Sequence, residues 1–74
     1  MITKITKAYT RRYSDTGQLK AYVEWQDHNG KSGRTEGAAI QKTKYHHVMP
    51  IGTHMVALFD RAFREGITIN HEIF

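Results

Sequence analysis

Two short segments have the composition of tight hairpin loops, and they constrain the fold more than any other feature of the chain. Ser14-Asp15-Thr16-Gly17 and Asp27-His28-Asn29-Gly30 each place a glycine fourth, after polar residues. The polar residues favour a type I turn, and the glycine supplies the left-handed conformation of a three-residue loop with a bulge. Because both segments lie between stretches that alternate apolar and polar residues, the sequence predicts a three-stranded meander over residues 2–36.

A three-residue loop at Asp15-Thr16-Gly17 would fix the register of the first hairpin by pairing Ser14 with Gln18. Every second pair beyond the loop then contributes to one largely apolar face, which we expect a helix to cover. The pairs expected on this face are Tyr13 with Leu19, Arg11 with Ala21, Tyr9 with Val23 and Lys7 with Trp25.

In the second hairpin we favour a three-residue loop at His28-Asn29-Gly30. This loop lays the ring of Trp25 over a glycine and places opposite charges face to face, and sheets favour both arrangements. A competing two-residue loop would slip the register by one and turn Arg34 toward the core. The favoured pairs are Asp27 with Lys31, Trp25 with Gly33, Glu24 with Arg34 and Val23 with Thr35.

The rest of the chain predicts a connection, a helix and a last strand. Residues 37–52 have no clean period and contain Pro50, so we expect a long irregular connection, which could equally hide a strand or an arm that orders on binding. Residues 53–66 fit a helix with Thr53 as its cap and Gly66 as its left-handed stop. Residues 67–74 alternate again, as a strand at the sheet edge or one offered to a partner chain, where it would form a homodimer seam.

These elements define one α+β domain over residues 1–74, in which an antiparallel sheet of three to four strands carries one C-terminal helix on one face and a terminal strand. The helix should bury a stripe of Met55, Phe59, Ala62 and Phe63. A core this small predicts marginal stability, or a dimer that adds to it. The expected core is Tyr9, Tyr13, Leu19, Val23, Trp25, Met55, Val56, Phe59, Phe63, Ile67 and Ile69.

The composition argues against an enzyme. The chain has no cysteine, so it has no thiol nucleophile or zinc-thiolate site. Its acidic residues lie mostly in turns or are dispersed, and the spacing of His46, His47 and His54 matches no recognised ligand motif. We predict a non-enzymatic protein with no metal or cofactor. Without a long apolar run, it should be cytoplasmic, in the host cell if a phage encodes it.

The net charge of +4 favours polyanionic partners but is modest for a dedicated nucleic-acid binder. In the expected register, Arg12 and Lys20 are like-charged neighbours on the face opposite the helix, and a phosphate would relieve their repulsion. Tyr22 could stack on a base there. The same face also fits an ordinary solvated surface on which Glu24 neutralises Arg34. The predicted partner-binding residues are Arg12, Lys20, Tyr22, Arg34, Lys42, Lys44 and Tyr45.

In its short cysteine-free chain, tight hairpins, basic sheet face and single terminal helix, the protein resembles small accessory proteins of phages and mobile elements, anti-CRISPR proteins among them. The segment THMVALFDRAFREG at residues 53–66 is similar in style to phage reading frames. The resemblance implies a stoichiometric inhibitor that docks on a CRISPR effector, and it carries over no functional residue. A positive charge differs from the acidic DNA mimics of that class and implies contact with an acidic protein surface or guide RNA, or occlusion through shape.

Two functions therefore follow from the sequence. The first is a phage-type inhibitor or adaptor that docks on a protein or ribonucleoprotein complex through the basic sheet face. The second is a direct DNA- or RNA-binding protein with a regulatory or recombination-accessory role. Phosphate contacts weaken steeply with salt, whereas a shape-based protein interface depends on a Tyr, Trp or Arg anchor. We favour the first because the chain is short for an enzyme and lightly charged for a nucleic-acid specialist.

Overall fold

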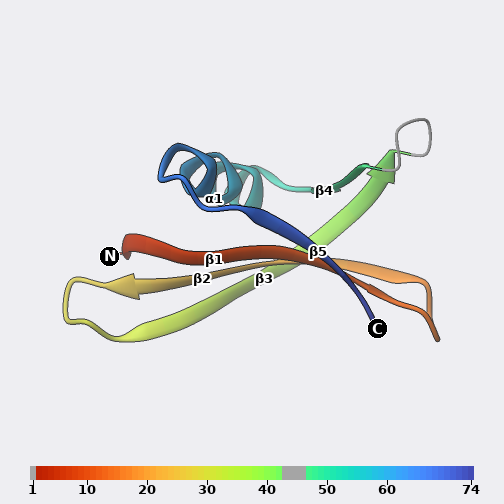
Figure 1. The fold of residues 1–74 in the computed structure, drawn as a ribbon, viewed down its shortest axis with the longest axis horizontal. Helices are drawn as coiled ribbons and strands as arrows, with labels where there is room; N and C mark the ends of the chain where they lie inside the picture. The colour runs from red at the N-terminus through yellow and green to blue at the C-terminus, as the bar shows by residue number, and fades with distance from the viewer. Residues whose placement is uncertain (1, 43–46) are drawn as a thin grey trace.

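The structure, a computed structural model, describes residues 2–42 and 47–74 (Figure 1). Within these residues the chain forms one five-stranded sheet, in the order β4-β3-β2-β1-β5, and one helix. Strands β1 to β4 form an antiparallel meander, and β5 runs parallel to β1. The α+β prediction is confirmed, with five strands in place of three to four. The elements are β1 (Ile2–Tyr13), β2 (Gln18–Asp27), β3 (Ser32–Lys42), β4 (His47–Pro50), α1 (Thr53–Arg64) and β5 (Ile69–Ile73).

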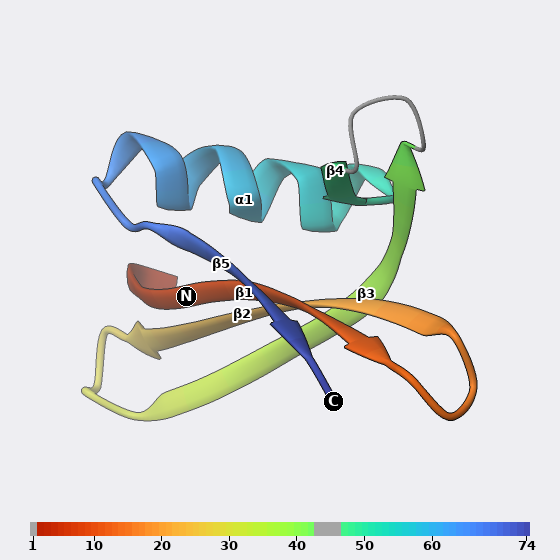
Figure 2. The same ribbon diagram turned by 45° about the vertical axis from the view of Figure 1, so that its right-hand side comes forward.

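The sheet curls around the helix. In Figure 2 the far end of β3 bends up toward the level of α1, and β4 lies beside the start of the helix. At the opposite edge of the sheet, β5 returns from the end of α1 along β1. The helix therefore covers one face of the sheet, and the other face is left without a second layer of secondary structure in the described part of the chain.

The first hairpin has a four-residue loop, Ser14–Gly17, so the expected register is wrong by one residue. Gly17 adopts a left-handed φ of 71°, and its N–H donates to the carbonyl of Tyr13 over 2.7 Å. Tyr13 therefore pairs with Gln18. A slip of one residue exchanges the two faces of a strand. Tyr9, Arg11 and Tyr13 thus lie on the face away from the helix, whereas Thr10 and Arg12 lie on the helix side.

The second hairpin has the predicted three-residue loop and register. The N–H of Asp27 donates to the carbonyl of Lys31 over 2.9 Å, and Gly30 has a φ of 78°. The Asp27 carboxylate accepts the N–H groups of Asn29 and Lys31, each at 2.9 Å, which stabilises the loop. The pairs of Trp25 with Gly33, Glu24 with Arg34 and Val23 with Thr35 are confirmed.

The expected irregular connection is wrong for most of its length. Residues 37–42 continue β3, and residues 47–50 form β4, which pairs antiparallel with β3. Pro50 is compatible with a strand here because β4 lies at the sheet edge, where a missing N–H breaks no ladder on the open side. Residues 43–46, with Lys44 and Tyr45, lie outside the described residues.

The helix begins one residue earlier than expected and without a side-chain cap. Gly52, with a φ of 94°, is the N-cap, so the expected capping role of Thr53 is wrong. The stop at Gly66 is confirmed by its φ of 80° and by a bond from its N–H to the carbonyl of Phe63 over 3.1 Å. The N–H of Ile67 reaches the carbonyl of Ala62 over 3.0 Å, which completes a Schellman motif.

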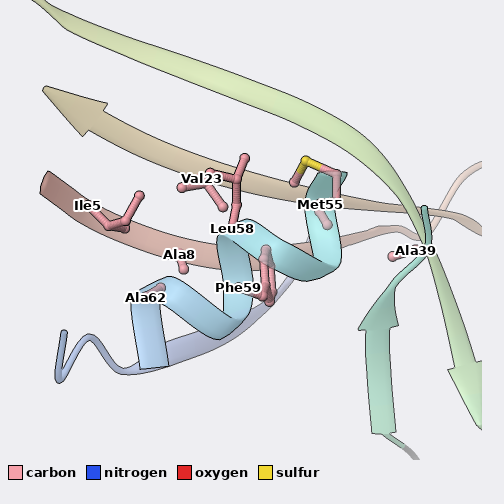
Figure 3. Close-up of a cluster of buried hydrophobic side chains, with 9 residues drawn as sticks. Ile5, Ala8, Val23, Ala39, Met55, Leu58, Phe59 and Ala62 are labelled. Atoms are coloured by element: carbon pink, nitrogen blue, oxygen red, sulfur yellow. The ribbon is translucent and has the colours of Figure 1, made fainter. Parts of the chain in front are cut away.

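The core lies between α1 and the covered face of the sheet (Figure 3). Small side chains at Ala8, Ala21 and Ala62, all fully buried, let the helix approach the strands closely. Phe63 was expected in the core but is 77% exposed, and Val56 is also exposed. Leu58 is buried instead of Phe63. The buried cluster is Ile5, Ala8, Ala21, Val23, Ala39, Met55, Leu58, Phe59 and Ala62.

A polar clamp fixes the end of the helix to the beginning of β1. Glu65 accepts the N–H of Ile5 at Oε1 over 2.9 Å and binds Arg61 through Oε2 at 2.7 Å. Arg61 also donates to the carbonyl of Thr3 over 2.9 Å. The Ile5 N–H and then the Arg61 guanidinium hold the pKa of Glu65 below its ordinary value.

We expect Gly33→Ala to destabilise the fold by about 1–3 kcal/mol through overpacking. A Cβ at Gly33 would lie 2.5 Å from carbons of the Trp25 ring, which is held by a 3.0 Å bond from Nε1 to the Thr35 hydroxyl. Urea unfolding followed by the fluorescence of the single tryptophan measures the loss. Ser32→Ala, on the same strand and exposed, is the control and should change stability little. Equal stability of the two variants would contradict the packing role of Trp25.

Candidate binding face

The sheet face opposite α1 carries a cluster of charged and aromatic side chains that contact one another. Alternate residues of β1 and β2 place tyrosines and cations there, β3 adds an arginine, and β5 with its following residue adds an acid and a phenylalanine. We call this surface the cationic aromatic face. It consists of Lys7, Tyr9, Arg11, Tyr13, Lys20, Tyr22, Glu24, Arg34, Glu36, Glu72 and Phe74.

Two stacked tyrosines form the base of the face. Tyr9 and Tyr22 are directly paired between β1 and β2, and their ring centroids lie 5.1 Å apart with an interplanar angle of 19°. Tyr9 is 1% and Tyr22 3% exposed, although no helix or second sheet formed by residues 2–42 or 47–74 covers them. Their rings are buried because charged side chains of the same face fold over them.

Arg11 connects this base to the end of the chain. Its guanidinium carbon lies 5.0 Å from the Tyr9 centroid, 5.2 Å from that of Tyr22 and 4.7 Å from that of Phe74. Its Nε donates to Oε1 of Glu72 over 2.8 Å. Because a planar guanidinium can stack and form ion pairs at once, one side chain joins β1, β2 and the segment after β5.

The exposed cations of the face rest on the buried rings. The Arg34 guanidinium lies 4.9 Å from the Tyr22 centroid, and the Lys7 ammonium lies 4.8 Å from the Tyr9 centroid. A hydrogen bond with Tyr9 raises the pKa of Arg34. Both side chains are exposed to solvent, and their contacts with the buried tyrosine rings restrict their positions. The face therefore presents preorganised positive charge.

The hydroxyls of Tyr13 and Tyr22 form a coupled pair at 3.0 Å. Burial, together with the bond to Tyr13, raises the pKa of Tyr22 to about 12. The bonds from Tyr22 and Arg11 lower the pKa of Tyr13, because they stabilise its phenolate. As the pH rises, the pair should therefore lose its first proton at a lower pH than an ordinary tyrosine and its second proton at a higher pH.

The structure brings three of the predicted binding residues together and moves a fourth away. Lys20, Tyr22 and Arg34 lie on the cationic aromatic face. Arg12, expected beside Lys20, lies on the helix side and donates to the side-chain oxygen of Gln41. Arg11 takes its place opposite Lys20. The sequence predicts this pair only if the loop of the first hairpin has four residues instead of three. The side chain of Lys42, and Lys44 and Tyr45, lie outside the described residues.

The repulsion expected on this face is relieved within the chain itself. Arg11 pairs with Glu72, and Lys20 lies 3.6 Å from Glu36. The expectation that two neighbouring cations here, Lys20 and an arginine of β1, need an external anion is therefore wrong. Tyr22 is also too buried to offer an open ring for stacking, in contrast to the prediction. On this face, the cations for which no ion pair is described are Lys7 and Arg34, and Glu24 lies opposite both of them in the strand register.

Comparison of the chain with protein-family models, curated proteins and solved structures found no match. Across residues 2–42 and 47–74, no group of three or more His, Cys, Asp or Glu side chains is placed to hold a metal ion. The same residues include no helix of the length and apolarity needed to cross a membrane.

In an alkaline titration followed by tyrosinate absorbance, we expect one tyrosine to ionise below the ordinary pKa of about 10 and Tyr22 near pH 12. Since folding raises the pKa of Tyr22, its contribution to stability is complete below pH 10 and is lost as the pH rises toward 12. Tyr22→Phe should remove the late step and return Tyr13 toward its ordinary pKa. Tyr9→Phe, the control, should keep both steps. A Tyr22→Phe titration that still showed both would contradict the pairing.

Proposed function

We propose that this protein is a non-enzymatic adaptor or inhibitor that docks on an acidic surface of a protein or nucleoprotein complex through the cationic aromatic face. The observation that carries the proposal is the support of Arg34 and Lys7 by the buried rings of Tyr22 and Tyr9. An arginine already held in one orientation loses little side-chain entropy on binding and is a typical anchor of protein interfaces.

The distribution of charge favours a protein partner over bare nucleic acid. Arg11 and Lys20 are engaged by Glu72 and Glu36, so they are less available for the several phosphate contacts on which nucleic-acid affinity depends. The buried tyrosine rings offer no stacking platform of the kind that single-strand binders use. The alternative, a direct DNA or RNA contact, is supported by the net charge of +4. The resemblance to phage accessory proteins also supports an inhibitor.

A titration of labelled single-stranded DNA, duplex DNA and RNA at about 50 and 200 mM salt separates these two functions. We expect only weak binding, because the two exposed cations of this face, Lys7 and Arg34, can neutralise few phosphates. Tight binding at low salt that falls by about a hundredfold or more at high salt would indicate several phosphate contacts and favour the nucleic-acid function.

Replacing both supported cations tests the face itself. Arg34→Gln with Lys7→Gln should reduce capture of the partner from host lysate by about tenfold or more, the loss expected for an interface anchor. The control is Arg64→Gln with Lys31→Gln, which removes the same charge from exposed positions elsewhere and should leave capture unchanged. Equal loss in both would indicate a general charge effect, and no loss in either would exclude this face as the contact.

A further inference from the structure

The outer edge of β5 is open. β5 pairs with β1 on one side and is the last strand of the described sheet. Natural edge strands are usually protected from pairing with another chain by lysine, proline, a bulge or a covering loop. β5 has the sequence Ile69-Asn70-His71-Glu72-Ile73, with neither lysine nor proline, and its five pairs with β1 show no bulge.

The order of residues in β5 is symmetric by chemical class about His71. We propose that a second copy of this chain pairs with β5 antiparallel, about a two-fold axis at His71, so that two sheets join into one. In this register Ile69 lies opposite Ile73 of the second copy, and Asn70 lies opposite Glu72. Such self-complementarity is what an isologous strand pair requires.

The apolar pairs would lie where apolar surface is exposed. His71 points to the helix side of the sheet, because its Nδ1 lies 2.6 Å from the hydroxyl of buried Thr10, and alternation puts Ile69 and Ile73 on that side. Ile73 is 75% exposed and Phe63 of α1 is 77% exposed. Ile69 and Phe63 line a pocket of about 330 Å³ between α1, β4 and β5. An Ile73 side chain from the second copy, beside Ile69, would enter this pocket and cover Phe63.

The polar pairs fit as well. On the other side of the strand, Glu72 binds Arg11 through Oε1. A side-chain amide of Asn70 from the second copy can donate to the same carboxylate, and no like charges are brought face to face by the Asn70–Glu72 pairs.

The opposite edge of the sheet is a poorer seam. β4 has four residues, His47–Pro50, and its proline cannot donate a hydrogen bond to a new strand. Its order of residues has no two-fold symmetry. The inference also stands apart from the proposed function, since pairing through the β5 edge leaves Lys7 and Arg34 on an open face.

Sedimentation equilibrium from about 1 μM to about 1 mM protein tests the proposal, because dimers with dissociation constants in that range are resolved there. We expect a reversible dimer for the wild type and a monomer, or affinity at least about tenfold weaker, for Ile73→Lys. Since Ile73 is mostly exposed, the variant should keep its circular dichroism spectrum. Ile51→Lys, at an exposed apolar position after β4 that does not line this pocket, is the matched control and should dimerise like the wild type.

A wild type that stays monomeric throughout would overturn the proposal and leave the β5 edge to a strand of a different protein. Dimerisation lost in Ile51→Lys but kept in Ile73→Lys would move the seam to the β4 edge and overturn the proposal equally. Arg34→Gln should leave the dimer intact, so failure of this proposal is distinguishable from failure of the proposed function.

A disulfide test does not depend on how Ile73→Lys folds. The chain has no cysteine, so His71→Cys can form a disulfide only between copies. On the proposed axis the two Cβ atoms would lie about 4.5–5.5 Å apart, close enough to bridge after a small shift. We expect a covalent dimer under mild oxidation at a rate at least about tenfold above that of His28→Cys, on an exposed hairpin loop. Equal rates would contradict the axis.

Discussion

The burial of β1 on both edges and both faces is the constraint on which the rest of the structure depends. β2 and β5 pair with its two edges. Over three consecutive residues, Ala8, Tyr9 and Thr10, exposure is at most 1%. Ala8 lets the helix approach, Thr10 binds His71, and Tyr9 supports the opposite face. Residues that alternate between faces can all be buried only where both faces are covered.

The chain achieves this coverage with one helix and a layer of long cationic side chains. Lys7, Arg11 and Arg34 lie over the tyrosine rings, and their apolar stems and ring contacts replace a second layer of secondary structure. The same contacts restrict how these charges can move. Stability and the candidate binding surface therefore depend on the same residues.

The sequence predicts what is decided locally. Glycines with left-handed φ mark both hairpins and the helix stop, and the Trp25 and Gly33 pair fixes the second register. The register of the first hairpin could not be predicted in this way, because a left-handed Gly17 fits a three-residue loop and a four-residue loop equally well. Tyrosine fits either face of a sheet, so the positions of Tyr9 and Tyr13 in the sequence could not show which of the two registers is right. The sequence left β4 only as an alternative to an irregular connection, because Pro50 argues against a strand everywhere except an edge.

The pairing of β5 with β1 joins residues far apart in sequence, as the contact between Thr10 and His71 spans 61 positions. Contacts this distant carry a large loop-closure cost until the intervening chain is ordered. While the meander and helix assemble, the outer edge of β1 is exposed and competes for any available strand. Lys4, Lys7, Arg11 and Arg12 lie along that edge strand. Their positive charge disfavours pairing of this edge with the same edge of another unfinished molecule, as lysine does on natural edge strands.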